Sequence, residues 1–461
     1  MFKKEVYINR RKALKHKVGS GIILLLGNNE SPMNYEDNTY PFRQDSTFLY
    51  FVGLQVPSLI TVFDVDEGKD ILFGDDLTMD MIVWMGSQPV LSEYAAKSGI
   101  EEVRPLKDLV SYIEKAKGSG REIHFLPPYR HDHMWKLNEL LGFSPAQLQQ
   151  KFSVHLVQSV VALREIKSEE EIVEIEKAVD ISVDMHVAAM QMARPGMTEA
   201  QIAAEIHKVA LASGGDIAFP IIATKNGQTL HNHNHSNIIN QGDMILVDAG
   251  AQTAMGYCGD LSSTFPVSQT FTEEQKEIYQ ISLNAHERAI SLLQPGIPFA
   301  DIHLEACRSI IEDMKAIGLM KGDTEEALIM GAHALFFPCG LGHMMGLDVH
   351  DMENFGEKWV GYNGEEKSTQ FGLKSLRLAK KLQPGHVLTI EPGIYFIPEL
   401  IDMWKAENKY SDFLNYEQIV KFKNFGGIRN EEDFLITPQG ARLLGKLCPK
   451  TISEVEQKRK G

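Results

Sequence analysis

The segment QGDMILVDAG at residues 241–250 recurs in similar form as QPGHVLTIEPG at residues 383–393. Each copy contains a turn, an apolar strand pattern and a carboxylate at the end of that strand. The carboxylate is Asp248 in the first copy and Glu391 in the second. We expect two related strands that place Asp248 and Glu391 around one central crevice.

A second pair of matching segments supports this repeat. RPGM at residues 194–197 and QPGI at residues 294–297 are each followed by a short loop and a helical pattern. Because both pairs occur in the same order along the chain, they predict a duplicated helix-helix-strand unit.

A domain boundary is expected near residues 160–170. Ser168 and Glu171 form a capping-box pattern there, which opens a long helix. The preceding part of the chain alternates short apolar runs with turn-forming clusters and amphipathic stretches, as is typical of an α/β domain. At 461 residues the chain is also too long for one ordinary domain. We therefore predict two domains, 1–160 and 161–461.

The composition, with 43% hydrophobic and 23% charged residues, is that of a soluble globular protein. The net charge of -16 argues against nucleic acid or an anionic membrane as a partner, because binding phosphates needs a basic face. Residues 1–11 lack the apolar core of a signal peptide, and the apolar run 21–26 is too short to span a bilayer. We expect a cytoplasmic protein. Its cysteines show no CxxC spacing, so neither a disulfide framework nor a zinc ribbon is indicated.

Asp248 and Asp260 lie on either side of a Gly-rich turn at residues 256–259. A β-hairpin would bring the two carboxylates together. Like charges side by side are unfavourable unless a cation or a shared proton lies between them. The pair therefore indicates a metal or a shared proton, and the alternative is two surface aspartates at strand ends.

Further candidate ligands follow along the chain. His343 and His350 lie in the Gly-rich, apolar segment 337–351, while Glu391 and Glu431 each lie next to glycines at a strand. The aspartate pair, the two glutamates and one of these histidines form an oxygen-rich set of four carboxylates and one imidazole. Such a site suits two hard-to-borderline divalent ions, with Mn²⁺ as the first choice and Co²⁺, Fe²⁺ or Zn²⁺ as alternatives.

The chain closely resembles the aminopeptidase P and prolidase family over nearly its whole length. In the N-terminal part the resemblance rests on YPFRQDSTFLY at residues 40–50 and on LREIKS at residues 163–168. In the C-terminal part it rests on the ordered set of metal-ligand positions Asp248, Asp260, His343, Glu391 and Glu431. The resemblance implies an α/β (α+β) protein. Its 1–160 domain would be of the creatinase-like, aminopeptidase P type, followed at 161–461 by the duplicated pita-bread fold shared with methionine aminopeptidase.

The resemblance also implies a role for each ligand. Asp260 and Glu431 would bridge two divalent ions. Asp248 would complete the site of one ion, and His343 with Glu391 would complete that of the other. Two such ions can hold a water between them, lower its pKa and polarise the scissile carbonyl. Glu391 would be the general base, whose proton passes on to the leaving proline nitrogen.

Three further residues are expected to act in catalysis. His231 and His350 match family positions that line the site, where they stabilise the tetrahedral intermediate or guide the substrate. The alternative for His231 is a solvated polar loop, HNHNH at residues 231–235, or a neighbouring histidine in its role. Arg429 would hold a neighbouring carboxylate by charge-assisted hydrogen bonds, and the alternative is a purely structural ion pair.

Two positions depart from the family pattern. Cys339 stands where many relatives have a histidine, which puts any contact made there in doubt. Asn430 replaces the usual aliphatic residue beside Glu431, so we expect altered packing and no loss of metal.

The function implied is that of a dinuclear metal-dependent Xaa-Pro aminopeptidase, which hydrolyses the bond between an N-terminal residue and a following proline. Its substrates would be proline-containing peptides, and the N-terminal domain would pair subunits into a homodimer or a larger homo-oligomer. The intact ligand set disfavours a non-catalytic pita-bread binding module and a metal-free creatinase-type enzyme. The long N-terminal domain disfavours a methionine aminopeptidase.

An Xaa-Pro dipeptidase, or prolidase, is the alternative on the same scaffold. The motif at 40–50 is more like aminopeptidase P, whereas the segment 375–385 and the insertion 399–423 are more like prolidases. In that prolidase-like segment Arg377 would reach the free carboxylate of a dipeptide's proline, because a planar guanidinium binds a carboxylate bidentately. The alternative for Arg377 is a surface arginine in a basic run with nearby lysines. We favour the aminopeptidase.

Overall fold

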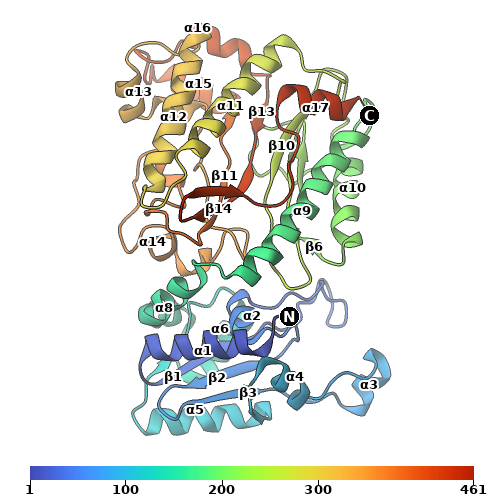
Figure 1. The fold of residues 1–461 in the computed structure, drawn as a ribbon, viewed down its shortest axis with the longest axis vertical. Helices are drawn as coiled ribbons and strands as arrows, with labels where there is room; N and C mark the ends of the chain where they lie inside the picture. The colour runs from blue at the N-terminus through green and yellow to red at the C-terminus, as the bar shows by residue number, and fades with distance from the viewer. Residues whose placement is uncertain (461) are drawn as a thin grey trace. The chain divides into compact units, whose positions relative to one another are not determined.

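The computed structural model describes residues 1–460, which form two compact units (Figure 1). The first unit contains Met1–Arg164 and Met352–Trp359, and the second contains Glu165–Asp351 and the chain from Val360 onward. Both units combine helices with strands, which confirms the predicted α/β (α+β) class. Among residues 1–460, every helix is too short or too polar to span a lipid bilayer.

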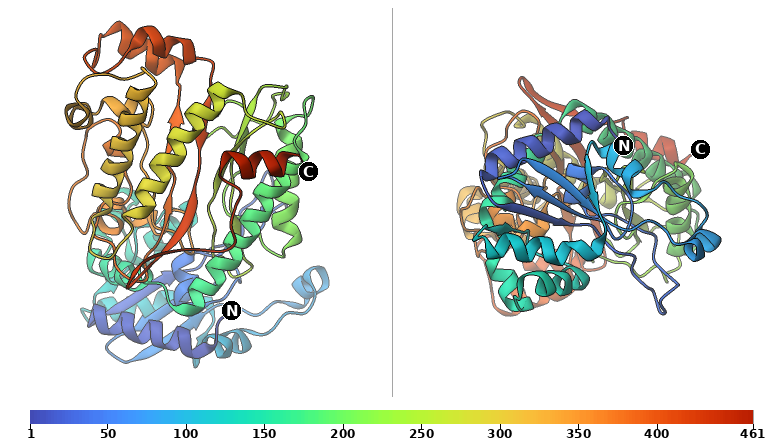
Figure 2. Two further views of the ribbon diagram at one scale, coloured as in Figure 1. Left: turned by 45° about the horizontal axis from the view of Figure 1, so that its top comes forward. Right: turned by 90° about the horizontal axis from the view of Figure 1, so that it is seen from below.

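A five-stranded sheet forms the centre of the first unit, in the order β4-β3-β2-β1-β5. Its strands are β1 (Ile22–Leu26), β2 (Ile60–Asp64), β3 (Lys69–Phe73), β4 (Glu102–Arg104) and β5 (Ile123–His124). The helices are α1 (Lys4–Val18), α2 (Ser46–Val52), α3 (Met79–Met85), α4 (Leu91–Ser98), α5 (Leu109–Gly118), α6 (His131–Leu141), α7 (Pro145–Lys151) and α8 (Val154–Arg164), with α14 (Glu357–Val360) at the end of the later segment. Helix α1 covers one face of the sheet and α5 covers the other (Figures 1 and 2).

One core layer of the first unit lies between the sheet and the helices α5 and α6. Ile22 and Leu24 of β1 point to the same face because side chains alternate along a strand. They pack in one buried cluster with Val62 of β2, Ile113 of α5 and Leu137 of α6. Each such side chain contributes about 1.5–3 kcal/mol when it is fully buried, so this layer stabilises the unit.

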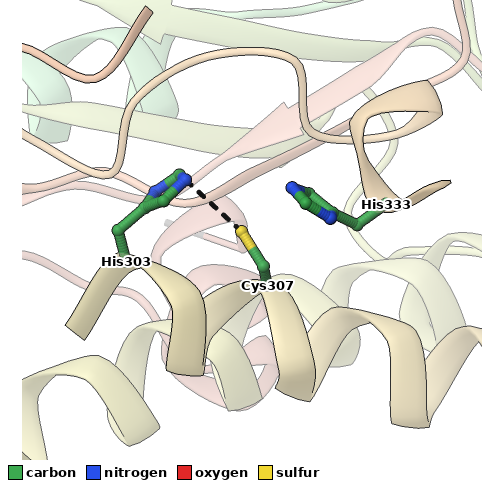
Figure 3. A group of neighbouring side chains, drawn as sticks. All are labelled: His303, Cys307 and His333. Carbon is green, nitrogen blue, oxygen red and sulfur yellow. Dashed lines mark hydrogen bonds between the residues drawn. The ribbon is translucent and has the colours of Figure 1, made fainter. Parts of the chain in front are cut away.

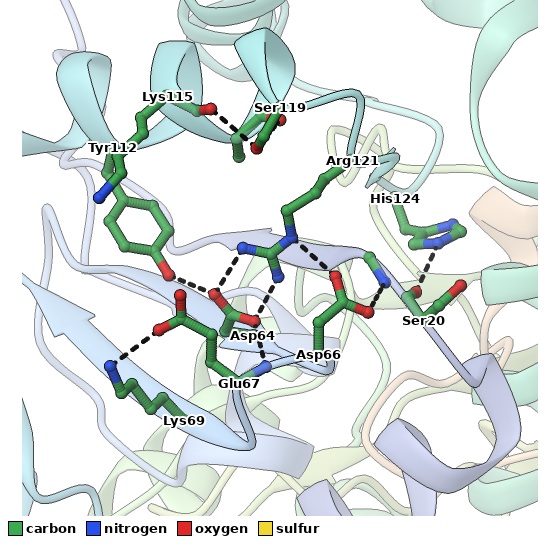
Figure 4. A network of polar contacts seen from close by, with 12 residues as sticks. Ser20, Asp64, Asp66, Glu67, Lys69, Tyr112, Lys115, Ser119, Arg121 and His124 are labelled. Atoms are coloured by element: carbon green, nitrogen blue, oxygen red, sulfur yellow. Dashed lines mark hydrogen bonds and ion pairs between the residues drawn. The ribbon is translucent and has the colours of Figure 1, made fainter.

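A polar network joins the end of β2 to α5 (Figure 4). The buried carboxylate of Asp64 accepts hydrogen bonds from the Tyr112 hydroxyl at 2.6 Å and from Arg121 Nη1 at 3.0 Å. Arg121 Nε also donates to Asp66 Oδ2 at 2.7 Å. Burial alone would raise the pKa of Asp64, but the hydrogen bonds from Arg121 and Tyr112 outweigh it and lower the pKa. Asp64 is therefore a charged and paired carboxylate inside the unit.

Removing Arg121 should destabilise the first unit, because it leaves a buried carboxylate without its cation. We expect Arg121→Ala to lower the free energy of unfolding by roughly 2–4 kcal/mol in a denaturant titration. Lys69→Ala is the matched control, since it removes an exposed ion pair with Glu67 and should cost less than about 1 kcal/mol. Equal losses in the two variants would contradict the role of Arg121.

The same pair makes stability depend on pH. The folded pKa of Asp64 lies below its unfolded value of about 3.9, so its contribution is fully present above that pH. The contribution is lost as the pH falls through the folded pKa. Arg121→Ala should therefore reduce the acid sensitivity of the first unit.

The second unit contains the three-stranded sheets β10-β8-β7 and β11-β14-β15 and the two-stranded pairs β12-β13 and β6-β9. Its strands are β6 (Asp216–Ile217), β7 (Ile222–Thr224), β8 (Met244–Asp248), β9 (Ala251–Gln252), β10 (Ser262–Pro266), β11 (Val387–Ile390), β12 (Gly393–Tyr395), β13 (Gly427–Arg429), β14 (Glu432–Thr437) and β15 (Gly440–Leu443). Its helices are α9 (Glu169–Met192), α10 (Glu199–Ala212), α11 (Glu273–Ser291), α12 (Phe299–Ala316), α13 (Thr324–Met330), α15 (Pro398–Ala406), α16 (Tyr416–Ile419) and α17 (Ile452–Arg459). Helix α9 packs against α10, and α11 packs against α12 (Figure 1).

The two halves of this unit repeat each other, as α9, α10 and β8 followed by α11, α12 and β11. The helix-helix turns make the same long-range bond: Gly196 N donates to Ile239 O at 2.9 Å, and Gly296 N donates to Leu382 O at 2.8 Å. Both glycines have a φ of 89°, which L side chains rarely adopt. The RPGM and QPGI segments therefore form equivalent turns.

The turns before the two related strands also match. Asn240 N donates to Asp243 Oδ2 at 2.8 Å before β8, and Gln383 N donates to His386 Nδ1 at 3.3 Å before β11. The predicted duplication of a helix-helix-strand unit is confirmed by these paired contacts. Asp248 ends the first related strand, and Glu391 directly follows the second.

Candidate metal centre

The first half of the unit supplies Asp248 and Asp260. Strands β8 and β10 pair antiparallel with Asp248 opposite Ser262, so the predicted hairpin forms. Asp260 lies two residues before Ser262. Burial raises the pKa of Asp260 to about 8, and the negative charge of Asp248 adds to this rise. The two carboxylates are therefore close enough to repel each other.

The second half supplies His343, Glu391 and Glu431. His343 N donates to Thr389 Oγ1 at 3.2 Å, and Thr389 N donates to His343 O at 3.0 Å, so His343 is fixed beside β11. Glu391 directly follows β11, and Glu431 lies between β13 and β14. Glu431 N donates to Ser262 O at 3.0 Å, which joins this half to β10 of the first.

The ligand atoms converge on one buried point. His343 Nε2 lies 3.4 Å from Asp260 Oδ2 and 3.6 Å from Glu391 Oε1. One ligand atom from each of Asp260, His343 and Glu431 lies within 4.8 Å of the others. These three residues are only 3–5% exposed. The structure thus brings together residues from the two repeats that are far apart in the sequence.

This set of donors fits a divalent cation. His343 Nδ1 lies 3.1 Å from the Met344 carbonyl oxygen, so a neutral ring that donates there turns its Nε2 lone pair toward the carboxylates. Among the described residues, Asp260 Oδ1 is buried without a hydrogen-bond partner. Burial raises the pKa of Glu391 and that of Glu431. A lone pair and several carboxylates that face one another are stabilised by a positive ion between them.

Arg429 orients two of the carboxylates. Its guanidinium forms an ion pair with Asp248, while Nε donates to Ser262 Oγ at 2.8 Å and Nη1 donates to the Tyr395 hydroxyl at 2.9 Å. The Ser262 hydroxyl in turn donates to Glu431 Oε2 at 2.7 Å. Arg429 is therefore ion-paired with a carboxylate of the cluster.

The sequence patterns did not single out Ser262, Tyr395 or Asp433. Ser262 lies two residues after Asp260, so the alternation of a strand would have placed it on the ligand side. Asp433 is fully buried and accepts a hydrogen bond from Asp260 N at 3.0 Å. The position of Tyr395 on the strand after Glu391 is the one feature of the sequence that could have connected it with the site.

His350 lies against His343. Their ring centroids are 4.3 Å apart at an interplanar angle of 66°. His350 is half-buried, and its charge acts on the pKa of Asp260. It therefore lies at the edge of the carboxylate cluster.

His231 lies in an exposed loop. Partial burial lowers its pKa, and the charges of Asp248, Arg429 and Arg377 also act on it. His231 thus lies within electrostatic reach of the ligands. Its neighbour His235 is half-buried, and a ring nitrogen of His235 lies 3.0 Å from Ile221 O.

Arg377 is half-buried, between the buried Leu376 and Leu378. Its charge acts on the pKa of Asp260. In the same basic run Lys380 is buried and pairs with Glu165, so this run is not a uniformly solvated face. Arg377 therefore lies within electrostatic reach of Asp260.

Cys339 and Asn430, which depart from the family pattern, each contact other polar side chains. Burial raises the pKa of the Cys339 thiol to about 12, and this thiol also forms a hydrogen bond with Tyr395. Asn430 is buried, and it donates to Ser282 Oγ at 3.1 Å and accepts from the Tyr279 hydroxyl at 2.9 Å. Both side chains therefore have polar partners.

Two family models match this chain. The family model "Aminopeptidase P, N-terminal domain" matches residues 7–124. The model "Metallopeptidase family M24" matches residues 173–438, which include every proposed ligand.

Relatives of similar length were also found. An Xaa-Pro dipeptidase of Rattus norvegicus is 32% identical over 95% of this chain and 89% of that protein. A probable Xaa-Pro aminopeptidase of Aspergillus niger is 30% identical over 97% of this chain and 95% of that protein. The structure of zinc-substituted E. coli aminopeptidase P in complex with product has a TM-score of 0.82 and 27% identity, and the match covers 100% of this chain and 98% of that one. The chain therefore belongs to metallopeptidase family M24, in its aminopeptidase P and prolidase group, and is a metallopeptidase with a divalent metal cofactor.

Proposed function

We propose that this protein is an Xaa-Pro aminopeptidase with two divalent metal ions. The observation that carries the proposal is the convergence of Asp260, His343, Glu391 and Glu431 in a chain whose relatives are named Xaa-Pro peptidases. An oxygen-rich set with one imidazole suits Mn²⁺, and Co²⁺, Fe²⁺ or Zn²⁺ are the alternatives.

The five ligand residues have distinct proposed positions. Asp248, Asp260, His343, Glu391 and Glu431 would hold the ions, which when bound polarise the scissile carbonyl and lower the pKa of a water. Asp260 and Glu431 would be shared between the two ions. Arg429 would act as a positioning residue, because it holds Asp248 directly and Glu431 through Ser262.

The remaining roles concern the substrate. Glu391 would accept a proton from the attacking water and pass it to the leaving proline nitrogen. Its side chain is 19% exposed, so it is more accessible than Asp260 or His343. His231 and His350 would donate hydrogen bonds to the substrate and to the tetrahedral intermediate.

A series of peptides of increasing length tests this function. With Mn²⁺ added, we expect the wild type to cleave Xaa-Pro-Xaa tripeptides and longer peptides at least as well as Xaa-Pro dipeptides. Cleavage of dipeptides alone would establish the second candidate, an Xaa-Pro dipeptidase, which the identity to the rat dipeptidase favours. No cleavage of any Xaa-Pro bond by metal-loaded protein would refute the proposed function.

Arg377 provides a second test of substrate length. If its guanidinium binds the carboxylate of a dipeptide's proline, Arg377→Ala should raise the KM for dipeptides by roughly 10- to 100-fold, since a charged hydrogen bond contributes about 1.5–3 kcal/mol. Tripeptides should be spared, because their carboxylate lies one residue further out. Lys374→Ala, at an exposed position in the same segment, should leave the KM of both substrates unchanged. An equal rise in KM for both lengths would exclude this role.

We also propose a homo-oligomer in the cytoplasm. The oligomer is supported by α3, in which Met79 is 72%, Val83 is 73% and Trp84 is 87% exposed. Apolar side chains exposed side by side are typical of an interaction surface. Light scattering on the purified protein would give the mass of the assembly, and a monomer would contradict the proposal. The proposed cytoplasmic location rests on the sequence, in which the apolar run 21–26 is too short to span a bilayer.

A further inference from the structure

A second group of metal-ligand side chains lies in the second unit, apart from the carboxylate cluster. His303 and Cys307 are one turn apart on α12 and share a face of the helix. His333 lies on the short 3-10 helix η2 (Ala332–Leu335). Figure 3 shows the rings of His303 and His333 pointing toward the thiol of Cys307 from two sides. One ligand atom from each residue lies within 4.8 Å of the others.

The group is buried and its polar atoms are poorly satisfied. All three side chains are 0% exposed. Among the described residues, His303 Nδ1 and both ring nitrogens of His333 have no hydrogen-bond partner. His303 Nε2 forms a hydrogen bond of 3.5 Å with Cys307 Sγ, which is only a weakly polar partner. Each unsatisfied buried polar group lowers the stability of the folded state by about 1–3 kcal/mol. These imidazoles therefore do not stabilise the apolar core unless their free nitrogens bind a ligand.

The protonation states suit a metal ligand. Burial lowers the pKa of His303 to about 3 and that of His333 to about 4, so both rings are neutral and offer a lone pair. Burial raises the pKa of the Cys307 thiol, so a thiolate at this position requires a cation beside it.

We propose that His303, Cys307 and His333 together bind one Zn²⁺ ion. Two imidazole nitrogens and one thiolate are ligands that zinc prefers, whereas Mn²⁺ and Mg²⁺ prefer oxygen. On binding, the Cys307 thiol would release its proton to solvent and form the sulfur-zinc bond. This ion would be additional to those held by the carboxylate cluster, and the two sites share no ligand.

Such an ion would link α12 to the segment that leads to the catalytic ligands. From η2 the chain runs on to His343 within ten residues. Tyr395 N, on the strand after Glu391, donates to Phe336 O at 2.8 Å, directly beyond η2. A zinc ion at the proposed site would therefore stabilise η2 and the segment that leads from it to His343, without contacting the substrate.

Zinc loading followed by dialysis tests the site. We expect Cys307→Ser to retain one equivalent of zinc per chain less than the wild type. In the wild type, X-ray absorption at the zinc edge should show a sulfur neighbour at about 2.3 Å, in contrast to about 2.0–2.2 Å for nitrogen and oxygen. None of the ligands of the carboxylate cluster contains sulfur, so this signal reports on the proposed site alone.

Two other cysteines provide matched controls. Cys339→Ser removes a thiol near the carboxylate cluster, and Cys448→Ser removes a thiol between β15 and α17; both variants should keep the zinc equivalent and the sulfur signal. Circular dichroism verifies that each variant is folded. A sulfur-free zinc spectrum in the wild type, or a sulfur signal that disappears with Cys339→Ser, would overturn the proposal. If Cys307→Ser does not fold, the wild-type spectrum together with those of Cys339→Ser and Cys448→Ser still decides the question. Peptide cleavage is measured separately, so a failure here leaves the proposed peptidase function intact.

Discussion

Replacing Glu391 by glutamine should lower kcat for Xaa-Pro cleavage by at least about 100-fold, because the amide keeps the size of the side chain but cannot accept the proton. Glu391 lies at the end of β11 and is 19% exposed, so the substitution does not disturb the apolar core. We expect the circular dichroism spectrum and the unfolding midpoint to stay close to those of the wild type. Steady-state kinetics on an Xaa-Pro peptide with Mn²⁺ gives the measurement.

A matched control separates this effect from a general loss of charge. Glu399→Gln changes an exposed glutamate on α15, close to Glu391 in the sequence, and should keep full activity. Since Glu391 is also a proposed ligand, the metal content of Glu391→Gln is measured alongside. Near-normal turnover in Glu391→Gln would refute its role as general base.

Replacing Asp260 by asparagine should abolish tight metal binding, and activity should fall with it by orders of magnitude. Asp260 is 4% exposed and lies 3.4 Å from His343 Nε2, at the centre of the ligand set. Its loss removes one negative charge and one of two proposed bridging ligands. A ligand that binds the folded state raises the unfolding midpoint, so Mn²⁺ should raise the midpoint of the wild type and leave that of Asp260→Asn unchanged.

Chelation is the corresponding test on the unmodified protein. Treatment of the wild type with a strong chelator should remove all peptidase activity, and added Mn²⁺ should restore it. The control for Asp260→Asn is Asp301→Asn, which changes an exposed aspartate on α12 and should retain metal and activity. Full activity in chelated protein without bound metal would contradict the whole assignment of the site.

Features that depend on residues close together in the sequence could be predicted from it, whereas contacts between residues far apart in the chain could not. The repeat was visible because each copy is a local pattern: a positive-φ glycine turn, a helix, and a strand that ends in a carboxylate. Asp248 and Glu391 could therefore be assigned to equivalent strand ends before any contact was known. Ligand types in a fixed order, such as His343 after a Gly-rich segment, also carry their chemistry in the sequence.

Only the tertiary structure shows which side chains form hydrogen bonds around the proposed ligands. The hydrogen bonds from Arg429 to Ser262 and Tyr395 join strands that are distant in the sequence. Neither Ser262 nor Tyr395 is part of a recognisable sequence motif. The assignment of Met352–Trp359 to the first unit is a similar case, since nothing in its composition distinguishes it from the flanking chain.

The cluster of His303, Cys307 and His333 shows the same limit most clearly. His303 and Cys307 share a helix face, but the spacing to His333 matches no metal motif, and the three converge only when α12 packs beside η2. The sequence by itself determined the repeat, the candidate ligand residues and the peptidase class, because turns, strand ends and the chemistry of individual residues are local properties. The packing of elements far apart in the chain decided which polar groups are buried together, since burial and long-range contacts exist only in the folded protein.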